Sequence, residues 1–142
     1  MTILTLDQAN AVIAAALAKA QELSLKPLGV AVLDAGGHLL AFQRQDGAST
    51  LRPQIAIAKA SGALALGVSS RAIQNMAADR PVFVASLGPI SAHGILPAAG
   101  GVIVVDGAGR PIGAVGATGD TSDNDEACVL AGIAAAGLTA QG

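Results

Sequence analysis

Aromatic residues are almost absent from this sequence, which has no Trp, no Tyr and only two Phe among 142 residues. Apolar residues nevertheless make up 52% of the chain, so a core must be built from Ala, Val, Ile and Leu. Such small side chains let helices approach a sheet closely, but each buries little apolar area. The composition therefore predicts one domain, residues 1–142, with surface buried between the subunits of a homo-oligomer.

Charged residues and cysteines are also scarce. Only 13% of the residues are charged, the net charge is −2, and Lys and Arg do not cluster, which argues against a surface that contacts nucleic-acid phosphates. The single cysteine, Cys128, excludes an intrachain disulfide, and its apolar helical surroundings favour a buried, inert thiol. No apolar run is long enough to cross a bilayer, and the N-terminus lacks the basic region of a signal peptide. We therefore expect a cytoplasmic protein without nucleic-acid or membrane partners.

Patterning along the chain predicts helices and two β-hairpins. The hairpins are expected at 28–44 and 101–117, around the turn sequences Asp34-Ala-Gly-Gly37 and Asp106-Gly-Ala-Gly109. A capping box at Thr5–Gln8 indicates a first helix that ends near residue 23. Three more helices are expected over 50–66, 69–78 and 122–136, and a short strand over 82–87. The order α-ββ-αα-(β)ββ-α, without βαβ alternation, predicts an α+β fold with an antiparallel sheet of about five strands flanked by helices.

Residues at the expected helix ends suggest particular caps. Ser49 or Thr50 is the expected N-cap of the helix over 50–66, and Gly67 suits the position just past its C-terminus. Ser69 or Ser70 starts the next helix, and Ser122 is the expected N-cap of the last one.

The segment 113–126 combines glycines at 113, 116 and 119 with a polar loop and an acidic helix start. Glycines at this spacing admit the close approach of another backbone or of a ligand, and both interpretations stay open. The spacing matches neither a Walker loop nor a Rossmann fingerprint. The acidic residues lack EF-hand spacing, and complementing the positive end of the helix explains them better than metal binding does.

Several polar side chains are candidates for a site, each with a structural alternative. His38 follows a turn and His93 lies in a glycine-rich loop, and neither has the spacing of a zinc site. Arg44 and Asp46 form either a surface ion pair or a carboxylate-orienting pair. Lys59 lies on an apolar helix face, either with its ammonium reaching solvent or in a pocket for an anionic group.

Four motifs in order resemble those of the GlcG/HbpS haem-binding family, which includes the C-terminal domain of PduO-type proteins. They are the opening helix at 4–9, the hairpin Asp34-Ala-Gly-Gly-His-Leu-Leu-Ala-Phe-Gln-Arg-Gln-Asp-Gly-Ala48, the turn Pro97-Ala-Ala-Gly-Gly-Val102, and Ile112-Gly-Ala-Val-Gly-Ala-Thr-Gly119 followed by Asp125-Glu126. Lys59-Ala60 fits between the second and third motifs. The resemblance covers nearly the whole chain and implies an antiparallel sheet flanked by helices, assembly into dimers or larger closed homo-oligomers, and binding of haem or a related tetrapyrrole in some members.

Two functional hypotheses follow from the resemblance and the residues together. In the first, a small-molecule binding protein takes haem with His93 or His38 as axial ligand, and Arg44 and Lys59 meet the propionates. The candidate ligand-binding residues further along the chain are Gly100, Gly101, Thr118, Gly119 and Thr121.

The second hypothesis is a cofactor-independent isomerase, tautomerase or hydrolase acting on a small oxo- or hydroxy-acid. Arg44 and Lys59 would hold the carboxylate of the substrate. A proton would be moved by His93, Asp46 or Asp120, while Thr118 and the backbone N–H groups of 119–121 would stabilise a developing oxyanion.

Overall fold

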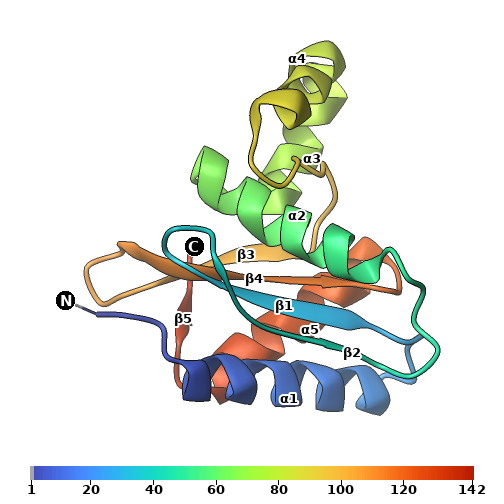
Figure 1. Ribbon diagram of the computed structural model, residues 1–142, viewed down its shortest axis with the longest axis vertical. Helices are drawn as coiled ribbons and strands as arrows, with labels where there is room; N and C mark the ends of the chain where they lie inside the picture. The colour runs from blue at the N-terminus through green and yellow to red at the C-terminus, as the bar shows by residue number, and fades with distance from the viewer. Residues whose placement is uncertain (1) are drawn as a thin grey trace.

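The computed structural model describes residues 2–142, which form a five-stranded antiparallel sheet with helices on both faces (Figure 1). The strands lie in the order β2-β1-β4-β3-β5. The elements are α1 (Leu6–Glu22), β1 (Gly29–Asp34), β2 (Leu39–Arg44), α2 (Arg52–Leu66), α3 (Ser70–Asp79), α4 (Pro81–Leu87), a 3₁₀ turn (Gly88–Ile90), β3 (Gly101–Val105), β4 (Pro111–Thr118), α5 (Ser122–Ala135) and β5 (Thr139–Ala140).

Both predicted hairpins and the α+β class are confirmed. The β1–β2 hairpin and the β3–β4 hairpin join through β1 and β4, which pair with each other inside the sheet. In this central pair, Gly29 lies opposite Thr118 and Asp34 lies opposite Gly113. The sheet therefore has two ends: the starts of β1 and α2 lie at one, and the hairpin turns at the other (right and left in Figure 1).

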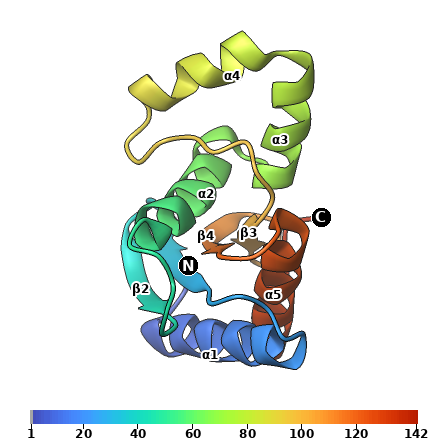
Figure 2. The same ribbon diagram turned by 90° about the vertical axis from the view of Figure 1, so that its right-hand side faces the viewer.

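The helices divide the interior into two layers of different thickness. Helices α1 and α5 cover one face of the sheet and α2 covers the other (Figure 2). The larger core lies under α1 and α5, where Val12, Ile13, Val115 and Val129 are buried. The smaller core, centred on Leu33, lies under α2.

Glycines let α2 lie almost directly on the sheet. A Cβ atom at Gly116 would collide with the backbone oxygen of Ala56, and one at Gly101 would collide with that of Lys59. Both collisions are with backbone atoms of a packed helix, which cannot move aside as a flexible side chain can. The sequence did not decide whether Gly116 makes room for another backbone or for a ligand. The structure shows that it makes room for the backbone of α2.

Helices α3 and α4 form an arm that projects away from the sheet (Figures 1 and 2). Helix α4 packs against α3 and the following 3₁₀ turn, and Val84 is its buried residue. Large apolar side chains remain exposed along the arm: Val82 is 79% exposed and Ile90 is 83% exposed.

The structure corrects four local predictions. Residues 82–87 are helical, because Pro81 suits the first position of a helix and the segment packs on α3. The fifth strand is instead Thr139–Ala140, which pairs with β3. Neither Ser49 nor Thr50 caps α2, whose N-cap is Leu51 without a side-chain bond.

The fourth correction concerns the last helix. Thr121 caps α5 in place of Ser122, and its hydroxyl accepts the N–H of Asn124. The capping box of α1 at Thr5 and Gln8, the Ser69 cap of α3 and the left-handed Gly67 that ends α2 are as predicted. Within residues 2–142, no helix is long and apolar enough to cross a membrane.

Candidate functional site

At the hairpin end of the sheet, His38 and Asp34 form a pair across the β1–β2 turn. The Nδ1 atom of His38 lies 3.3 Å from Oδ1 of Asp34, and the imidazole is 80% exposed. Oδ1 of Asp34 also accepts the backbone N–H groups of Gly36 and His38, each at 2.9 Å. The hydrogen bond from the His38 backbone N–H lowers the pKa of Asp34, so this carboxylate stays charged beside the imidazole ring. No hydrogen bond from Nε2 of His38 is found within residues 2–142.

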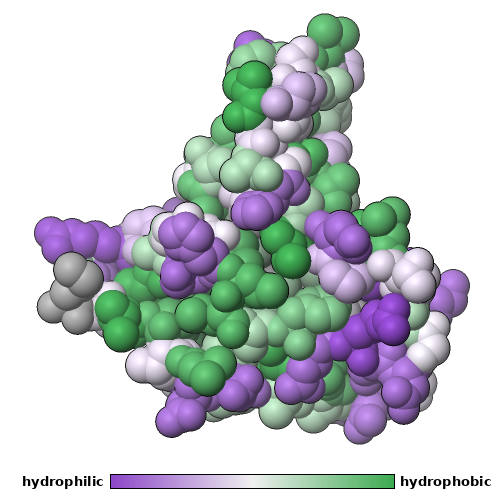
Figure 3. Space-filling view, in the orientation of Figure 1, coloured by the Kyte–Doolittle hydropathy of each residue, from purple (hydrophilic) through white to green (hydrophobic). Residues whose placement is uncertain are grey.

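Two adjoining clefts lie beside this pair, and we call them together the hairpin-end groove. One, of about 390 Å³, is lined by His38 and by apolar residues that include Leu4, Leu40 and Ile112. The other, of about 400 Å³, contains Arg110 and Asp106. The two clefts share Thr2, Ala35 and Ile112. The surface on this side of the molecule is largely hydrophobic below α2 (Figure 3).

In the interior, Lys59 of α2 forms an ion pair with Asp125 of α5, next to the end of β4. Its ammonium donates to Oδ2 of Asp125 at 3.2 Å and to the carbonyl of Ala117 at 3.0 Å. The two side chains are only 4% and 1% exposed. Burial lowers the pKa of Lys59 and raises that of Asp125, while their mutual attraction opposes both shifts.

Three further residues predicted as ligand-binding lie around this buried pair. A Cβ atom at Gly100 would lie 3.0 Å from the Lys59 ammonium, and Gly101 lies against the Lys59 backbone. Thr118 is 2% exposed. Gly101 is fixed further by Ser70, whose hydroxyl accepts its N–H at 2.7 Å. Lys59, Gly100, Gly101 and Thr118 are thus close together but enclosed, with the ammonium engaged by protein atoms.

At the opposite end of the sheet, Arg52 reaches from the first turn of α2 to the end of β4. Its Nη1 donates to the Thr118 hydroxyl at 2.8 Å. A cation in the first turn faces the positive end of the helix dipole, an arrangement that costs about 0.3–1 kcal/mol. Arg52 lines a cavity of about 400 Å³ together with Lys26, Gly119, Asp120 and Thr121. We call it the Arg52 cavity.

Asp120 forms a fixed wall of the Arg52 cavity. Its carboxylate accepts the side-chain amide of Asn124 and the backbone N–H groups of Lys26 and Thr121, at 2.8–3.0 Å. These bonds, that of Asn124 foremost, lower the pKa of Asp120 to about 2. Such a group holds the loop in place and stays ionised at neutral pH, which makes it a poor proton carrier there.

Gly119 brings this loop against the chain entering β1. Its φ is +147°, and a Cβ atom would collide with the backbone oxygen of Pro27. Gly119 is therefore needed for close backbone packing. This packing places Lys26 next to the loop at 119–121, and both line the Arg52 cavity.

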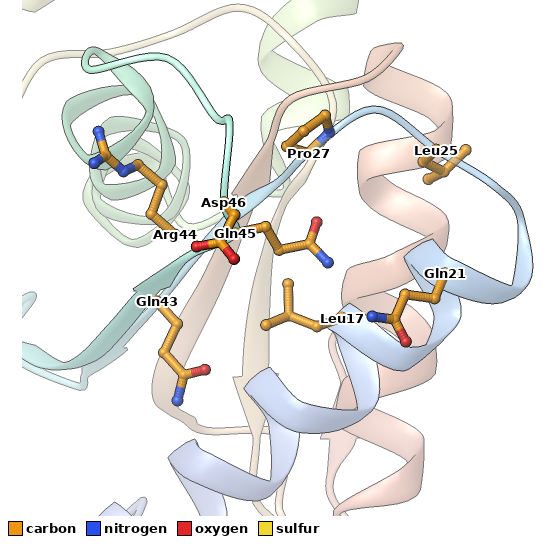
Figure 4. A pocket seen from close by; sticks show the side chains of 8 residues that line it. All are labelled: Leu17, Gln21, Leu25, Pro27, Gln43, Arg44, Gln45 and Asp46. Atoms are coloured by element: carbon orange, nitrogen blue, oxygen red, sulfur yellow. The ribbon is translucent and has the colours of Figure 1, made fainter.

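Arg44 and Asp46 line a third cleft, of about 490 Å³, between the end of β2 and α1 (Figure 4). Both side chains are exposed. The guanidinium of Arg44 points away from Leu17 and Gln21 on the helix side of the cleft (Figure 4). Gln45 between them accepts the backbone N–H of Leu28 at 2.8 Å, which ties the loop to β1.

His93 lies apart from these groups, on the loop between the arm and β3. Its side chain is exposed, and it lines none of the clefts described above. The neighbouring Gly94 and Ile95 pack on α2 at Ala58 and Gly62. The sequence-predicted site residues thus fall into separate places in one chain, rather than around one pocket.

The acidic start of α5 is used within the protein. Arg71 of α3 binds Glu126 through Nε at 3.0 Å and also binds Asp123, which raises the pKa of the arginine. Within residues 2–142, no three His, Cys, Asp or Glu side chains are grouped closely enough to hold a metal ion.

Sequence reasoning did not single out Arg52 or the Asp34–His38 pair. A signal existed for each. An arginine at the first position of an Ala-rich helix opposes the usual charge preference of helix ends. An aspartate four residues before a histidine across a tight Gly-Gly turn places the two side chains within reach of each other.

Comparison with known proteins identifies the relatives of this chain. The family model described as "Haem degrading protein HbpS-like" matches residues 4–134. No curated protein sequence matches the chain significantly.

Solved structures of the same fold are similar over most of the chain. A double mutant of HbpS from Streptomyces reticuli is 30% identical, with a TM-score of 0.81 over 94% of this chain and 87% of that one. Protein ORFY of Klebsiella pneumoniae is 28% identical, with a TM-score of 0.83 over 94% and 90%. A PduOC–haem complex has a TM-score of 0.87 over 99% and 100%, and at 21% identity it shows the shared fold alone.

Proposed function

Because the chain belongs to the family of HbpS-like haem-degrading proteins, we propose that it binds haem or a related tetrapyrrole in the hairpin-end groove. The proposal depends on one observation: His38 is exposed beside an apolar cleft, with its Nδ1 against the carboxylate of Asp34. Histidines that bind metals commonly donate their other ring N–H to a carboxylate, which fixes the orientation of the ring. The Nε2 atom of His38 would then be the atom that holds the iron.

The remaining groups of the groove suit the rest of a tetrapyrrole. Leu4, Leu40 and Ile112 provide an apolar wall for a flat ring. Arg110 in the adjoining cleft is placed to meet a propionate. When bound, haem would supply the redox and oxygen chemistry of its iron, while the chain binds and orients it.

His38 is a better ligand candidate than His93 in one chain. Both imidazoles are exposed, but among residues 2–142 no carboxylate pairs with His93, and His93 lines none of the clefts described above. Arg44 and Lys59 were also expected near the propionates. Lys59 is enclosed with Asp125, and Arg44 lies at the other end of the sheet.

The geometry favours binding over the cofactor-independent enzyme. That hypothesis requires Arg44, Lys59 and a proton carrier around one substrate. Within a chain these groups lie in separate places, and Asp120 keeps its charge down to about pH 2 because its pKa is about 2.

Haemin titration followed at the Soret band tests the proposal. We expect a stoichiometric shift for the wild-type protein, loss of the ligated spectrum in His38→Ala, and a wild-type spectrum in the matched control His93→Ala. Arg110→Gln should weaken binding by about fivefold, as expected for one partly exposed ion pair. Unchanged spectra in His38→Ala would refute the assignment, and loss of the shift in His93→Ala alone would move the site to the arm loop.

We also propose that the arm contacts a second copy of the chain in a homo-oligomer. Val82 and Ile90 are exposed on an arm that projects away from the sheet (Figure 1), and large apolar side chains exposed together can mark a protein interface. Light scattering at micromolar concentration should give a mass above the 13.8 kDa of one chain. A monomer in both the wild-type protein and Val82→Asp would refute the oligomer.

A further inference from the structure

We propose that the Arg52 cavity binds the carboxylate of a small organic acid. This site lies at the opposite end of the sheet from the hairpin-end groove and does not depend on haem binding. Its lining is Lys26, Arg52, Gly119, Asp120 and Thr121, around a volume of about 400 Å³. That volume is within the range of small-molecule sites, about 300–1,000 Å³.

Both cations of the cavity have unused hydrogen-bonding capacity. A guanidinium has five N–H donors, and Arg52 uses one of them, on Thr118. Within residues 2–142, neither Arg52 nor Lys26 forms an ion pair. Arg71 provides a contrast within the same chain, because its guanidinium is held by Glu126 and Asp123. Arg52 is half-buried and held by Thr118, yet no carboxylate in the described part of the chain forms an ion pair with it.

The placement of Arg52 is unfavourable for the helix that carries it. It occupies the first position of α2, and the first turn of that helix contains no acidic residue. A positive charge there opposes the helix dipole. Departures from local preference without a compensating partner tend to mark functional positions. A bound carboxylate would provide the missing partner for both the arginine and the helix end.

The Thr118 hydroxyl orients the arginine for this role. Thr118 is buried at the end of β4 and accepts from one Nη1–H of Arg52. This bond leaves the other edges of the planar guanidinium for a ligand, and a carboxylate matches such a fork with two parallel hydrogen bonds.

Asp120 limits the charge of the ligand. The lining carries two positive charges, on Lys26 and Arg52, and one negative charge, on Asp120. Asp120 keeps its charge because its pKa is about 2. A ligand with a single carboxylate therefore balances the lining, whereas a doubly charged phosphate leaves excess negative charge beside Asp120.

An NMR titration of the ¹⁵N-labelled protein with lactate tests the proposal. We expect saturable shifts of the backbone amides at 119–122 and no such shifts with lactamide, the neutral analogue. Arg52→Gln should weaken binding about tenfold or more, because a charge-assisted pair is lost. Arg80→Gln removes the same charge on the arm, where the guanidinium lies over Phe83, and should bind lactate like the wild-type protein.

Further variants keep the test decisive if Arg52→Gln does not fold. Arg52→Lys retains the charge without the fork and should show intermediate affinity, and Lys26→Met should weaken binding by about threefold. Equal binding of lactamide, wild-type affinity in both Arg52 variants, or tighter binding of inorganic phosphate at the same amides would each overturn the proposal. Haemin should leave the lactate shifts unchanged, so failure of the haem assignment and failure of this one are distinguishable.

Discussion

The two ends of the central strand pair differ in chemistry although they belong to the same strands. At the hairpin end, Asp34 and Ile112 border an apolar groove with one oriented imidazole. At the other end, Gly29 and Thr118 lie beside a polar cavity with two cations. The ends are about 17 Å apart, at about 3.3 Å per residue of β1. One sheet thus supports two candidate sites that do not share a residue.

The difference arises from what covers the strand ends. At the hairpin end, the N-terminal segment lies across the turns and contributes Leu4 and Thr2. At the other end, the N-terminus of α2 meets the loop before α5. The N-terminus of a helix has a positive electrostatic potential and free backbone N–H groups, and the loop adds polar side chains. Figure 3 shows hydrophobic area in the left and central part of the surface below α2, and polar area at the lower right.

The largest effect should come from the ion pair that supports the polar end. Lys59→Met leaves the Asp125 carboxylate buried without its cation, and we expect a loss of about 3–5 kcal/mol in the free energy of unfolding. The double variant Lys59→Met/Asp125→Asn should recover much of this loss, because an amide oxygen can still accept the N–H of Asp120. Chemical denaturation measures both. A double variant no more stable than Lys59→Met would contradict the explanation.

A pair of glycine substitutions compares the rigidity of the two ends. Gly119→Ala introduces a methyl group against the Pro27 carbonyl at a positive φ, and we expect a cost of about 2–4 kcal/mol. Gly37→Ala, at a φ of +82° with open space around it, should cost about 1 kcal/mol from backbone strain alone. Thermal unfolding of the two variants gives the comparison, and equal costs would show that the Pro27 contact contributes nothing.

Crossing the two binding assays tests whether the ends act separately. Arg52→Gln should leave the haemin spectrum and affinity unchanged, and His38→Ala should leave the lactate affinity unchanged, each within about twofold. A loss of both ligands in either variant would mean that the two ends are coupled through the sheet or across a subunit boundary.

A change in binding of intermediate size is expected at Asp34, which positions His38. Asp34→Asn removes the charged acceptor beside Nδ1 but keeps a carbonyl oxygen there, so haemin affinity should fall by about tenfold rather than vanish. The same variant should leave lactate binding intact. If haemin affinity does not change, the orienting role of the carboxylate is wrong even where His38 itself is the ligand.

The smallest effect is expected in an acid titration of the polar end. The folded-state pKa of Asp120 is about 2, below its ordinary value of 3.8. Its stabilising contribution is therefore complete above pH 3.8 and is lost as the pH falls through about 2. Asp120→Asn should flatten the stability profile in that window. An unchanged profile would show that the hydrogen bonds from Asn124 and Lys26 add no stability.

Local signals predicted most of the fold. The Gly-rich turns identified both hairpins, and the capping box at Thr5 located the start of α1. The prediction of a strand over residues 82–87 was wrong. The Val and Phe residues of this segment favour strands, whereas Pro81 and packing on α3 make it helical. Thr139–Ala140 has no strand signal of its own, and only the exposed edge of β3 makes it a strand.

The candidate site was less predictable because it depends on contacts between residues that are far apart in the sequence. Lys59 and Asp125 are 66 residues apart, and their pairing follows from how closely α2 lies on the sheet. Gly116 signalled this closeness, and Gly113 and Gly119 signalled close contacts with Leu33 and Pro27, but the sequence could not say whether a backbone or a ligand filled the space. The structure shows backbone in all three cases.

The single thiol of Cys128 has a practical consequence. The side chain is fully buried in the larger core, and burial raises its pKa to about 11. A thiol reagent can therefore reach it only when α5 separates from the sheet, and the rate of labelling reports the free energy of that opening. The sequence thus contains its own probe of local opening, and no engineered cysteine is needed. The labelling rate would also show how far a ligand at either end of the sheet slows that opening.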